Sequence, residues 1–170
     1  MGRGEERRRF LITVIVTECV LQKQLESEFP LIDSDPHFRR VVRYFRPSDY
    51  YYMAGSTLAF PGALWLMESA SPARGKGKLS AAMKLSAALG LCGGFLYAYQ
   101  RSTFRFWGWS ENEREQQRAQ EEAQSGTVIG QGESSLSDEM QGVAHRNSVF
   151  SQLNLAVLPW FNVVNHKYHS

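Results

Sequence analysis

The chain has 170 residues, a formal net charge of +2 and a mean hydropathy of −0.35. This near-neutral charge gives no reason to expect nucleic-acid binding, and the polar average means that a membrane-embedded part would be a minority of the chain. The two cysteines, Cys19 and Cys92, lie in an unusual leader and in the middle of an apolar segment, so we expect neither a disulfide framework nor a Cys-x-x-Cys zinc site.

Residues 1–24 form a leader that no single class of targeting segment explains. Arg7–Arg9 precede the apolar run FLITVIV, as in a secretory signal. The run is short, however, Glu18 ends it, and no small-x-small cleavage site follows. The acidic residues also disfavour a mitochondrial transit peptide. A signal and a wrongly placed start codon therefore both stay open as interpretations.

Residues 25–47 are predicted to form a basic amphipathic helix before the membrane. Asp35 can cap a helix that begins at Pro36, and Pro47 stops it. Apolar residues recur inside it at helical spacing, whereas its arginines lie on other faces. Such a helix suits a membrane surface, where lipid phosphates accept the arginines, although a small helix packed on a soluble partner is the alternative. The arginines predicted at this surface are Arg39, Arg40, Arg43 and Arg46.

Residues 48–101 are predicted to form a transmembrane helical hairpin. Its two apolar segments, about 50–68 and 79–100, would each be about 27–32 Å long as helices, close to the ~30 Å hydrocarbon core of a bilayer. One short basic connection joins them, and neither segment has the polar face that a soluble helical hairpin needs. Ser48 or Asp49 can cap the first helix, and Pro61 should kink it.

Small residues recur at every fourth position in both apolar segments and predict two helix-packing faces. The second segment contains a G-x-x-x-G motif, from Gly90 to Gly94, which lets another backbone approach closely. Either the two faces pack on each other or one of them docks on a partner subunit. The residues of the faces are Gly55, Ala59 and Ala63 in the first segment and Ala82, Ser86, Gly90, Gly94 and Ala98 in the second.

Residues 102–170 are predicted to be a polar helical arm, a linker and an interfacial C-terminal segment. Ser110 and Glu113 have the spacing of a capping box that opens a charged helix without an apolar stripe, which is typical of a solvated helix or a projecting arm. Residues 125–137 have the composition of a flexible linker. Leu153–Val164 is too short to span and is predicted to be a re-entrant or surface-lying anchor. The residues predicted at the interface after the second segment are Arg101, Arg105, Trp107, Trp109 and Trp160.

No set of residues predicts a catalytic, cofactor-binding or metal site. Asp33 and Asp35 are explained by helix capping. His166 and His169 are one helical turn apart, but no third ligand is evident, and His37 stands alone, as does His145. We therefore expect no small-molecule substrate. The enzymatic alternative is that the C-terminal flank acts on lipid or quinone, and its residues would be His145, Arg146, His166 and His169.

Several strings resemble one family closely: PLIDSDPHFRRVVRYFRPSDY, YQRSTFRFWGWSENERE, MQGVAHRNS and PWFNVVNH. They are similar to the twenty-one-kilodalton accessory subunit of fungal mitochondrial respiratory complex I, the NADH:ubiquinone oxidoreductase. The resemblance covers Phe29 to about His169. Residues 1–24 have no counterpart in it, and the family is expected to continue beyond Ser170. The fold predicted from the residues is an all-α membrane protein. The resemblance implies a two-span subunit of the membrane arm of the complex, in the inner mitochondrial membrane, with no redox centre of its own.

The functional hypothesis is a non-catalytic accessory subunit that stabilises or scaffolds the membrane arm. Its expected partners are membrane-arm subunits and anionic phospholipids. The alternative is a hairpin component of a carrier or import complex, but the hydroxyls of Ser56, Thr57 and Ser86 offer too little for a polar pathway. Eight arginines flank the hairpin, against three or four basic residues in its connection, which predicts that both termini face the matrix. The flanking arginines are Arg39, Arg40, Arg43, Arg46, Arg101, Arg105, Arg114 and Arg118.

Overall fold

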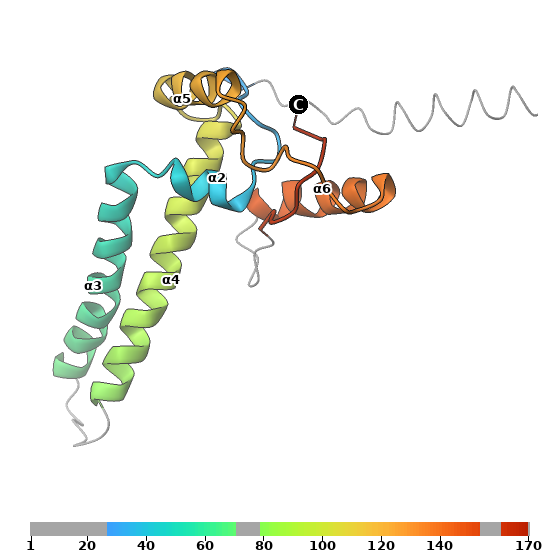
Figure 1. Ribbon diagram of the computed structural model, residues 1–170. Helices are drawn as coiled ribbons and strands as arrows, with labels where there is room; N and C mark the ends of the chain where they lie inside the picture. Colours follow the sequence, from blue (N-terminus) through green and yellow to red (C-terminus); the bar gives the residue numbers. More distant parts are fainter. Residues whose placement is uncertain (1–26, 71–78, 154–160, 170) are drawn as a thin grey trace, which may run out of the picture.

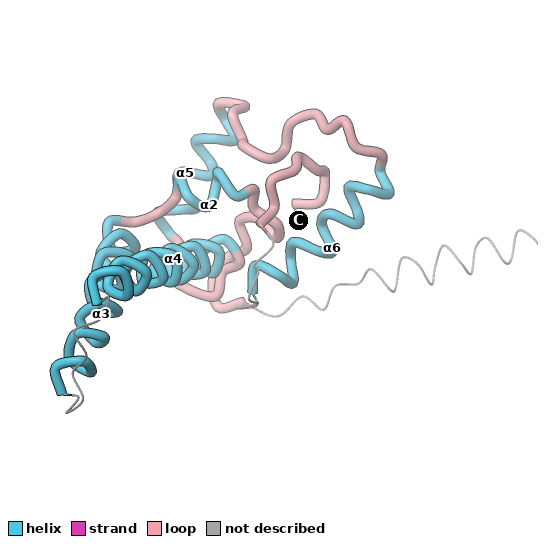
Figure 2. Tube along the Cα trace, turned by 90° about the horizontal axis from the view of Figure 1, so that it is seen from below, coloured by secondary structure: helices cyan, strands magenta, loops and turns pink. Residues whose placement is uncertain are grey.

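The computed structural model describes residues 27–70, 79–153 and 161–169, and every regular element in these ranges is a helix (Figure 1). Two long helices run side by side in opposite directions, and the other elements gather at one end of this pair, in a part that we call the base (residues 27–46, 98–153 and 161–169). In Figure 2 the base spreads to one side of the pair. The helices are α2 (Phe38–Arg43), α3 (Pro47–Ala70), α4 (Leu79–Phe106), α5 (Glu113–Gln124) and α6 (Asp138–Leu153).

The α3 and α4 helices touch through the glycines of the G-x-x-x-G motif. Gly90 and Gly94 are buried, and a Cβ atom built on Gly90 would lie only 2.5 Å from the backbone oxygen of Ser56. The hydroxyl of Ser56 donates to the Gly90 carbonyl at 2.8 Å. The two backbones are therefore close enough for one side chain to bond directly to the other helix, as small residues permit in apolar surroundings.

The predicted small-residue face of α3 does not meet α4. Gly55, Ala59 and Ala63 are exposed, and a Cβ atom on Gly55 would find no atom within 4 Å. Met53, Ser56 and Thr57 lie on the side toward α4 instead. The physical reason is that Ser56 fills the contact with a hydrogen bond, which glycine and alanine side chains cannot make. A role for the exposed face in docking another protein stays a prediction. In the predicted face of α4, Ala82 is exposed, Ser86 is half-buried and Ala98 is fully buried.

Among the described helices, only α4 is both long and apolar enough to cross a membrane. The α3 helix has an inward row of hydroxyls, an internal proline (Pro61) and Glu68 near its end, so it falls short of that standard. The 28 residues of α4 correspond to about 42 Å, more than the ~30 Å of a hydrocarbon core. Its last turns therefore continue, without a break, into the base.

The core of the base forms between α2 and the end of α4. Val41 and Tyr44 are buried against Ala98, Tyr99 and Phe106. The ring of Phe38 stacks on Tyr99, with 5.6 Å between the ring centres. A further aromatic residue, Phe161, brings the C-terminal tail onto the same cluster.

Three local predictions about α2 and the start of α3 need correction. The helix α2 spans only Phe38–Arg43, and its N-cap is His37, whose Nδ1 accepts the N–H of Arg39 at 3.1 Å. Asp35 does not cap it, because its carboxylate is bound by the C-terminal tail. Pro47 is the first residue of α3. Ser48 and Asp49 both lie inside α3 and so do not precede it as caps, but the Asp49 carboxylate reaches back to accept the backbone N–H of Arg46 at 2.8 Å, which satisfies a donor at the helix start.

The α5 helix is neither capped nor placed as predicted. It begins at Glu113 after Asn112, so the Ser110–Glu113 capping box does not form, and the amide of Asn112 donates to the carbonyls of Pro30 and Arg105 instead. The helix is also no projecting arm, because Glu115 and Glu122 are buried where they meet arginines of the base.

The two segments around α6 are partly described. In the predicted linker, Gly130 is buried with a φ of +100° and lies so close to His37 that a Cβ atom would come within 2.6 Å of it. Of the predicted interfacial anchor, residues 154–160 lie outside the described ranges, as do residues 1–24 and the hairpin connection. Its end, Phe161 and Asn162, packs into the base.

Candidate functional site

The base contains a cluster in which one buried carboxylate receives three side chains from the C-terminal part of the chain. Asp35 Oδ2 lies 2.9 Å from His166 Nε2 and 3.2 Å from His145 Nδ1. It also accepts the hydroxyl of Ser148. All four residues are buried. We call this group, together with Asp33 and His169, the histidine cluster.

Asp33 extends the histidine cluster to α2 and α5. Its Oδ1 lies 2.9 Å from His169 Nδ1 and accepts the backbone N–H of Asp35 at 3.0 Å. Its Oδ2 forms an ion pair with Arg40 at 2.6 Å, and the same guanidinium reaches Glu122 at 3.3 Å. Residues at the beginning, middle and end of the described chain are thus joined through buried charges.

Hydrogen bonds set the ionisation of Asp35. Burial alone would raise its pKa, but the bonds from His145, His166 and Ser148 outweigh burial and hold the pKa below its usual value. Because the folded pKa is lowered, the carboxylate stabilises the fold above its unfolded pKa. That stability is lost as the pH falls through the folded value.

His169 should make the attachment of the C-terminal tail weaken as the pH rises. Burial alone would lower its pKa, but the hydrogen bond and charge of Asp33, with two backbone carbonyls, raise the pKa above the usual 6.5. The stability that protonated His169 contributes is complete below the unfolded pKa and is lost as the pH rises through the folded pKa. Hydrogen exchange of the tail amides, compared across this range, should show the loss.

The variant His169→Gln should remove this pH dependence. The wild-type chain is the necessary reference, because burial lowers the pKa of His37 and therefore gives a contribution of opposite sign. If hydrogen exchange of the tail amides depended on pH in the same way in the wild-type chain and in the variant, His169 would not be the cause of the weakening.

Three residues of the histidine cluster have the composition of a metal site. The ligand atoms of Asp35, His145 and His166 lie within 4.8 Å of one another. The backbone N–H of Tyr168, however, donates to His166 Nδ1 at 3.0 Å. A neutral ring that accepts at Nδ1 carries its proton on Nε2, and that atom faces Asp35. The amide nitrogen of Asn162 also lies 2.9 Å from Nε2. Both ring nitrogens of His166 are thus engaged by groups of the chain, and the geometry favours a hydrogen-bonded cluster.

The sequence did not reveal this cluster because its members are far apart along the chain. His145 and Asp35 are separated by 110 positions, and Ser148 and Asp35 by 113. The serine hydroxyl donates to the carboxylate and to the backbone carbonyl of His145. Neither partner is an imidazole nitrogen, so the group also lacks the order of a nucleophile activated by a base. The only local signal was the pair of aspartates, which capping explained equally well.

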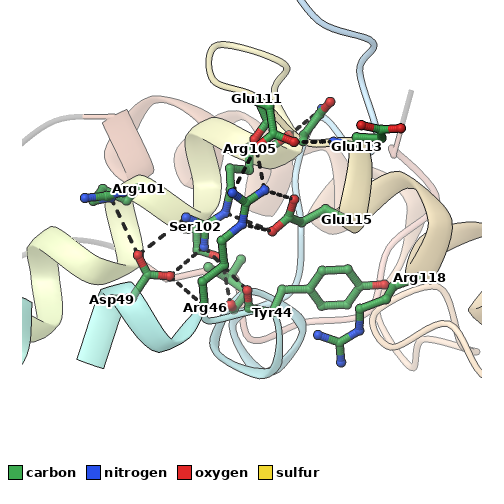
Figure 3. Close-up of polar contacts among 12 residues, drawn as sticks. Tyr44, Arg46, Asp49, Arg101, Ser102, Arg105, Glu111, Glu113, Glu115 and Arg118 are labelled. Carbon is green, nitrogen blue, oxygen red and sulfur yellow. Dashed lines mark hydrogen bonds and ion pairs between the residues drawn. The ribbon is translucent and has the colours of Figure 1, made fainter. Parts of the chain in front are cut away.

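A second polar group, the arginine network, joins α3, α4 and α5 at the top of the helix pair (Figure 3). Arg46 contacts Glu115 at 2.6 Å and Glu111 at 2.9 Å. Arg105 contacts Asp49 at 2.6 Å and Glu115 at 3.2 Å. The members of the network are Arg46, Asp49, Arg101, Arg105, Glu111 and Glu115.

The structure directs several of the predicted membrane-surface residues into the base. Arg40 and Arg105 are buried because carboxylates from other elements neutralise them there, and Arg46 is mostly engaged by α5. Trp107 is buried and donates to the carbonyl of Ser34 at 2.8 Å. These side chains therefore contact the base, whereas the sequence predicted contact with lipid phosphates. The predicted residues that stay at least partly exposed are Arg39, Arg43, Arg46, Arg101 and Trp109, and Trp160 lies outside the described residues.

Replacing Glu115 with glutamine should lower the free energy of unfolding of the chain by about 2 kcal/mol, because two arginines would lose a buried charge partner. The matched control is Glu111→Gln, since Glu111 contacts the same Arg46 from an exposed position, where ion pairs contribute little. Denaturant unfolding of both variants in detergent micelles measures the difference. If both variants lowered the free energy of unfolding equally, burial of Glu115 would not determine how much its ion pairs stabilise the chain.

The geometry defines a class of protein: a helical protein in which a long, apolar and largely uncovered helix pair stands on a small base held together by buried ion pairs. Comparisons of the sequence with known proteins all point to one family. The profile described as NADH-ubiquinone oxidoreductase complex I, 21 kDa subunit matches residues 26–111, and the one for the C-terminal part of that subunit matches residues 115–170. The chain belongs to the family of the 21 kDa subunit of NADH-ubiquinone oxidoreductase complex I. The resemblance predicted from the strings is thereby confirmed.

One curated relative shows how far the similarity extends. The chain is 50% identical over 153 residues to the NADH-ubiquinone oxidoreductase 20.9 kDa subunit of Neurospora crassa, which covers 88% of this chain and 81% of the relative. The histidine cluster has a clear place in this division: its aspartates lie in the first matched segment and its histidines in the second. In this chain the contacts of the cluster therefore join the two matched segments.

Proposed function

We propose that the chain is an accessory subunit of complex I that attaches to the membrane arm through its α3–α4 pair and stabilises that arm. Family membership and the named function of the Neurospora crassa relative support the assembly. The observation that carries the attachment is the uncovered apolar surface: only 11% of the most apolar part of α4 is buried by the chain itself. A surface of this size is expected to contact lipid or another protein.

The same proposal places both α3 and α4 across the inner mitochondrial membrane. The α3 helix runs antiparallel to α4 along its length (Figure 1), and the large apolar side chains of both helices point outward. Among the described residues, the elements outside the pair all lie at one of its ends, as expected if the chain crosses the membrane an even number of times. The exposed apolar residues include Leu58, Phe60, Trp65, Leu66, Met67, Leu85, Leu89 and Leu91.

The chain has no reactive centre of its own in this proposal. The histidines that an enzyme at the C-terminal flank would use, His145, His166 and His169, are bound to buried carboxylates. Their geometry supports a structural role, which agrees with an accessory subunit.

Native gels of solubilised mitochondrial membranes test the assignment. A tagged chain should migrate with NADH dehydrogenase activity, and its removal should reduce the amount of assembled membrane arm. Migration as a free protein, or with a carrier or import complex, would contradict the proposal and favour the alternative assembly.

We also propose that both termini face the matrix. The eight flanking arginines support this orientation, because positive residues collect on the side that is not translocated. Protease added to mitoplasts should then cut near Lys76 and spare α5. Cleavage of α5 with an intact connection would reverse the orientation.

A further inference from the structure

One guanidinium of the arginine network differs from the others. Arg46 and Arg105 each have a carboxylate oxygen at 2.6 Å, whereas the ion pair of Arg101 with Asp49, from Nε, is 3.5 Å long. The side chain of Arg101 is 32% exposed and that of Arg105 is 3% exposed. Figure 3 shows Arg101 at the edge of the network, with Asp49 between it and the remaining members.

Two tyrosines hold Arg101 in a fixed position. Its Cζ lies 4.4 Å from the ring centre of Tyr52 and 6.0 Å from that of Tyr97, within the range of cation–π attraction. The two rings meet edge to face at 5.3 Å, and each tyrosine is about half exposed. The terminal nitrogens of Arg101 have no hydrogen-bond partner among the described residues. The guanidinium of Arg101 is therefore held in place before any ligand binds, and its terminal nitrogens can still donate hydrogen bonds.

The position of Arg101 along α4 suits a lipid headgroup. Toward the hairpin connection, Leu91 and Tyr97 are exposed, whereas Ser102, directly after Arg101, is fully buried in the base. Arg101 thus stands where α4 passes from an uncovered surface into the base. If the α3–α4 pair spans the bilayer as proposed above, this is the level of the lipid phosphates, where tyrosine is also favoured.

We propose that Arg101, positioned by Tyr52, Tyr97 and Asp49, binds the phosphate group of a membrane phospholipid. A guanidinium presents two parallel N–H donors that match two phosphate oxygens. The three arginines and three carboxylates of the network balance in formal charge, so recognition relies on these directed bonds and not on net charge. Anionic and zwitterionic phospholipids should therefore both bind, and a lipid without phosphate should not. This inference rests on the membrane insertion in the proposed function.

Native mass spectrometry of the full chain in detergent micelles, titrated with phosphatidylglycerol or phosphatidylcholine, measures the binding. We expect Arg101→Gln to weaken it about tenfold for both lipids, as loss of a charge-assisted bidentate pair implies. Arg101→Lys keeps the charge but lacks the planar fork, so its binding should be intermediate. The control is Arg114→Gln, an exposed arginine on α5 that should change nothing. Circular dichroism shows whether each variant keeps its helices.

The outcomes separate this inference from the membrane proposal. A wild-type chain that floats with liposomes but retains phospholipid equally in all variants would overturn the site and leave the membrane role intact. A wild-type chain that does not float would overturn both. Equal retention of diacylglycerol would show an apolar groove without phosphate recognition. Displacement of the lipid by millimolar inorganic phosphate would instead assign the site to free phosphate.

Discussion

Replacing Asp35 with asparagine is expected to lower the free energy of unfolding of the base by about 4 kcal/mol, because an amide cannot accept the bonds of all three donors and the unpaired ones stay buried. The donors come from His145, Ser148 and His166. Denaturant unfolding of the full chain in detergent micelles, followed by the fluorescence of buried Trp107, measures this loss.

The matched control for Asp35→Asn is Asp138→Asn at the start of α6. Asp138 also forms an ion pair, with Lys167 at 3.0 Å, but its side chain is 77% exposed. Water screens such a pair, so the same chemical change should have little effect there. If the two variants unfolded at the same denaturant concentration, the histidine cluster would not be what holds the tail to the rest of the base.

Replacing Gly94 with leucine is expected to separate α3 from α4 at a cost of about 3 kcal/mol, the upper part of the range for overpacked sites. A Cβ atom at this position would lie 2.8 Å from the Cα of Met53. The hydroxyl of Ser56 lies closer still and can rotate away at the loss of its hydrogen bond to Gly90, but the backbone of Met53 cannot rotate away. The variant should still insert into membranes but be depleted from the assembled complex on native gels.

Gly93→Leu is the control for Gly94→Leu because it has the same composition and adds the same bulk. A Cβ atom on Gly93 would meet no atom within 4 Å, so it should leave the helix pair intact. Normal assembly of Gly94→Leu would mean that the contact with Met53 does not hold the pair together. Depletion of the Gly93 variant alone would instead place a partner on the opposite face of α4.

Predictions from the sequence succeeded where the signal was local. The helical character of both apolar segments follows from their length and composition, and the spacing of Gly90 and Gly94 indicated a close approach of two backbones. What local spacing could not show is which residue would face these glycines. In α3 the small residues suggested Gly55, yet Ser56, one position further, turns toward α4 because its hydroxyl gains a hydrogen bond across the pair.

The polar clusters could not be predicted for a related reason. Periodicity reports the face of a helix on which a residue lies, but not which distant segment covers it. Arg40 and Arg105 therefore looked like surface arginines, since their carboxylates come from α5, from the first turn of α3 and from the loop before α2. Asp35 likewise looked like a cap, although its partners follow more than a hundred positions later.

The wide separation of the partners in the histidine cluster dictates an order of events during synthesis. The apolar contacts between α2 and α4 become available as soon as Phe106 has left the ribosome. Asp33 and Asp35 cannot acquire their partners then, because His145, His166 and His169 are made later. The two aspartates must stay hydrated until the segment that carries these histidines has been made, so the base closes only after that segment has left the ribosome. A polypeptide that is released early would contain the helix pair, but the loop with Asp33 and Asp35 would lack its histidine partners. Such an unpaired loop is a defect that quality-control proteases can recognise.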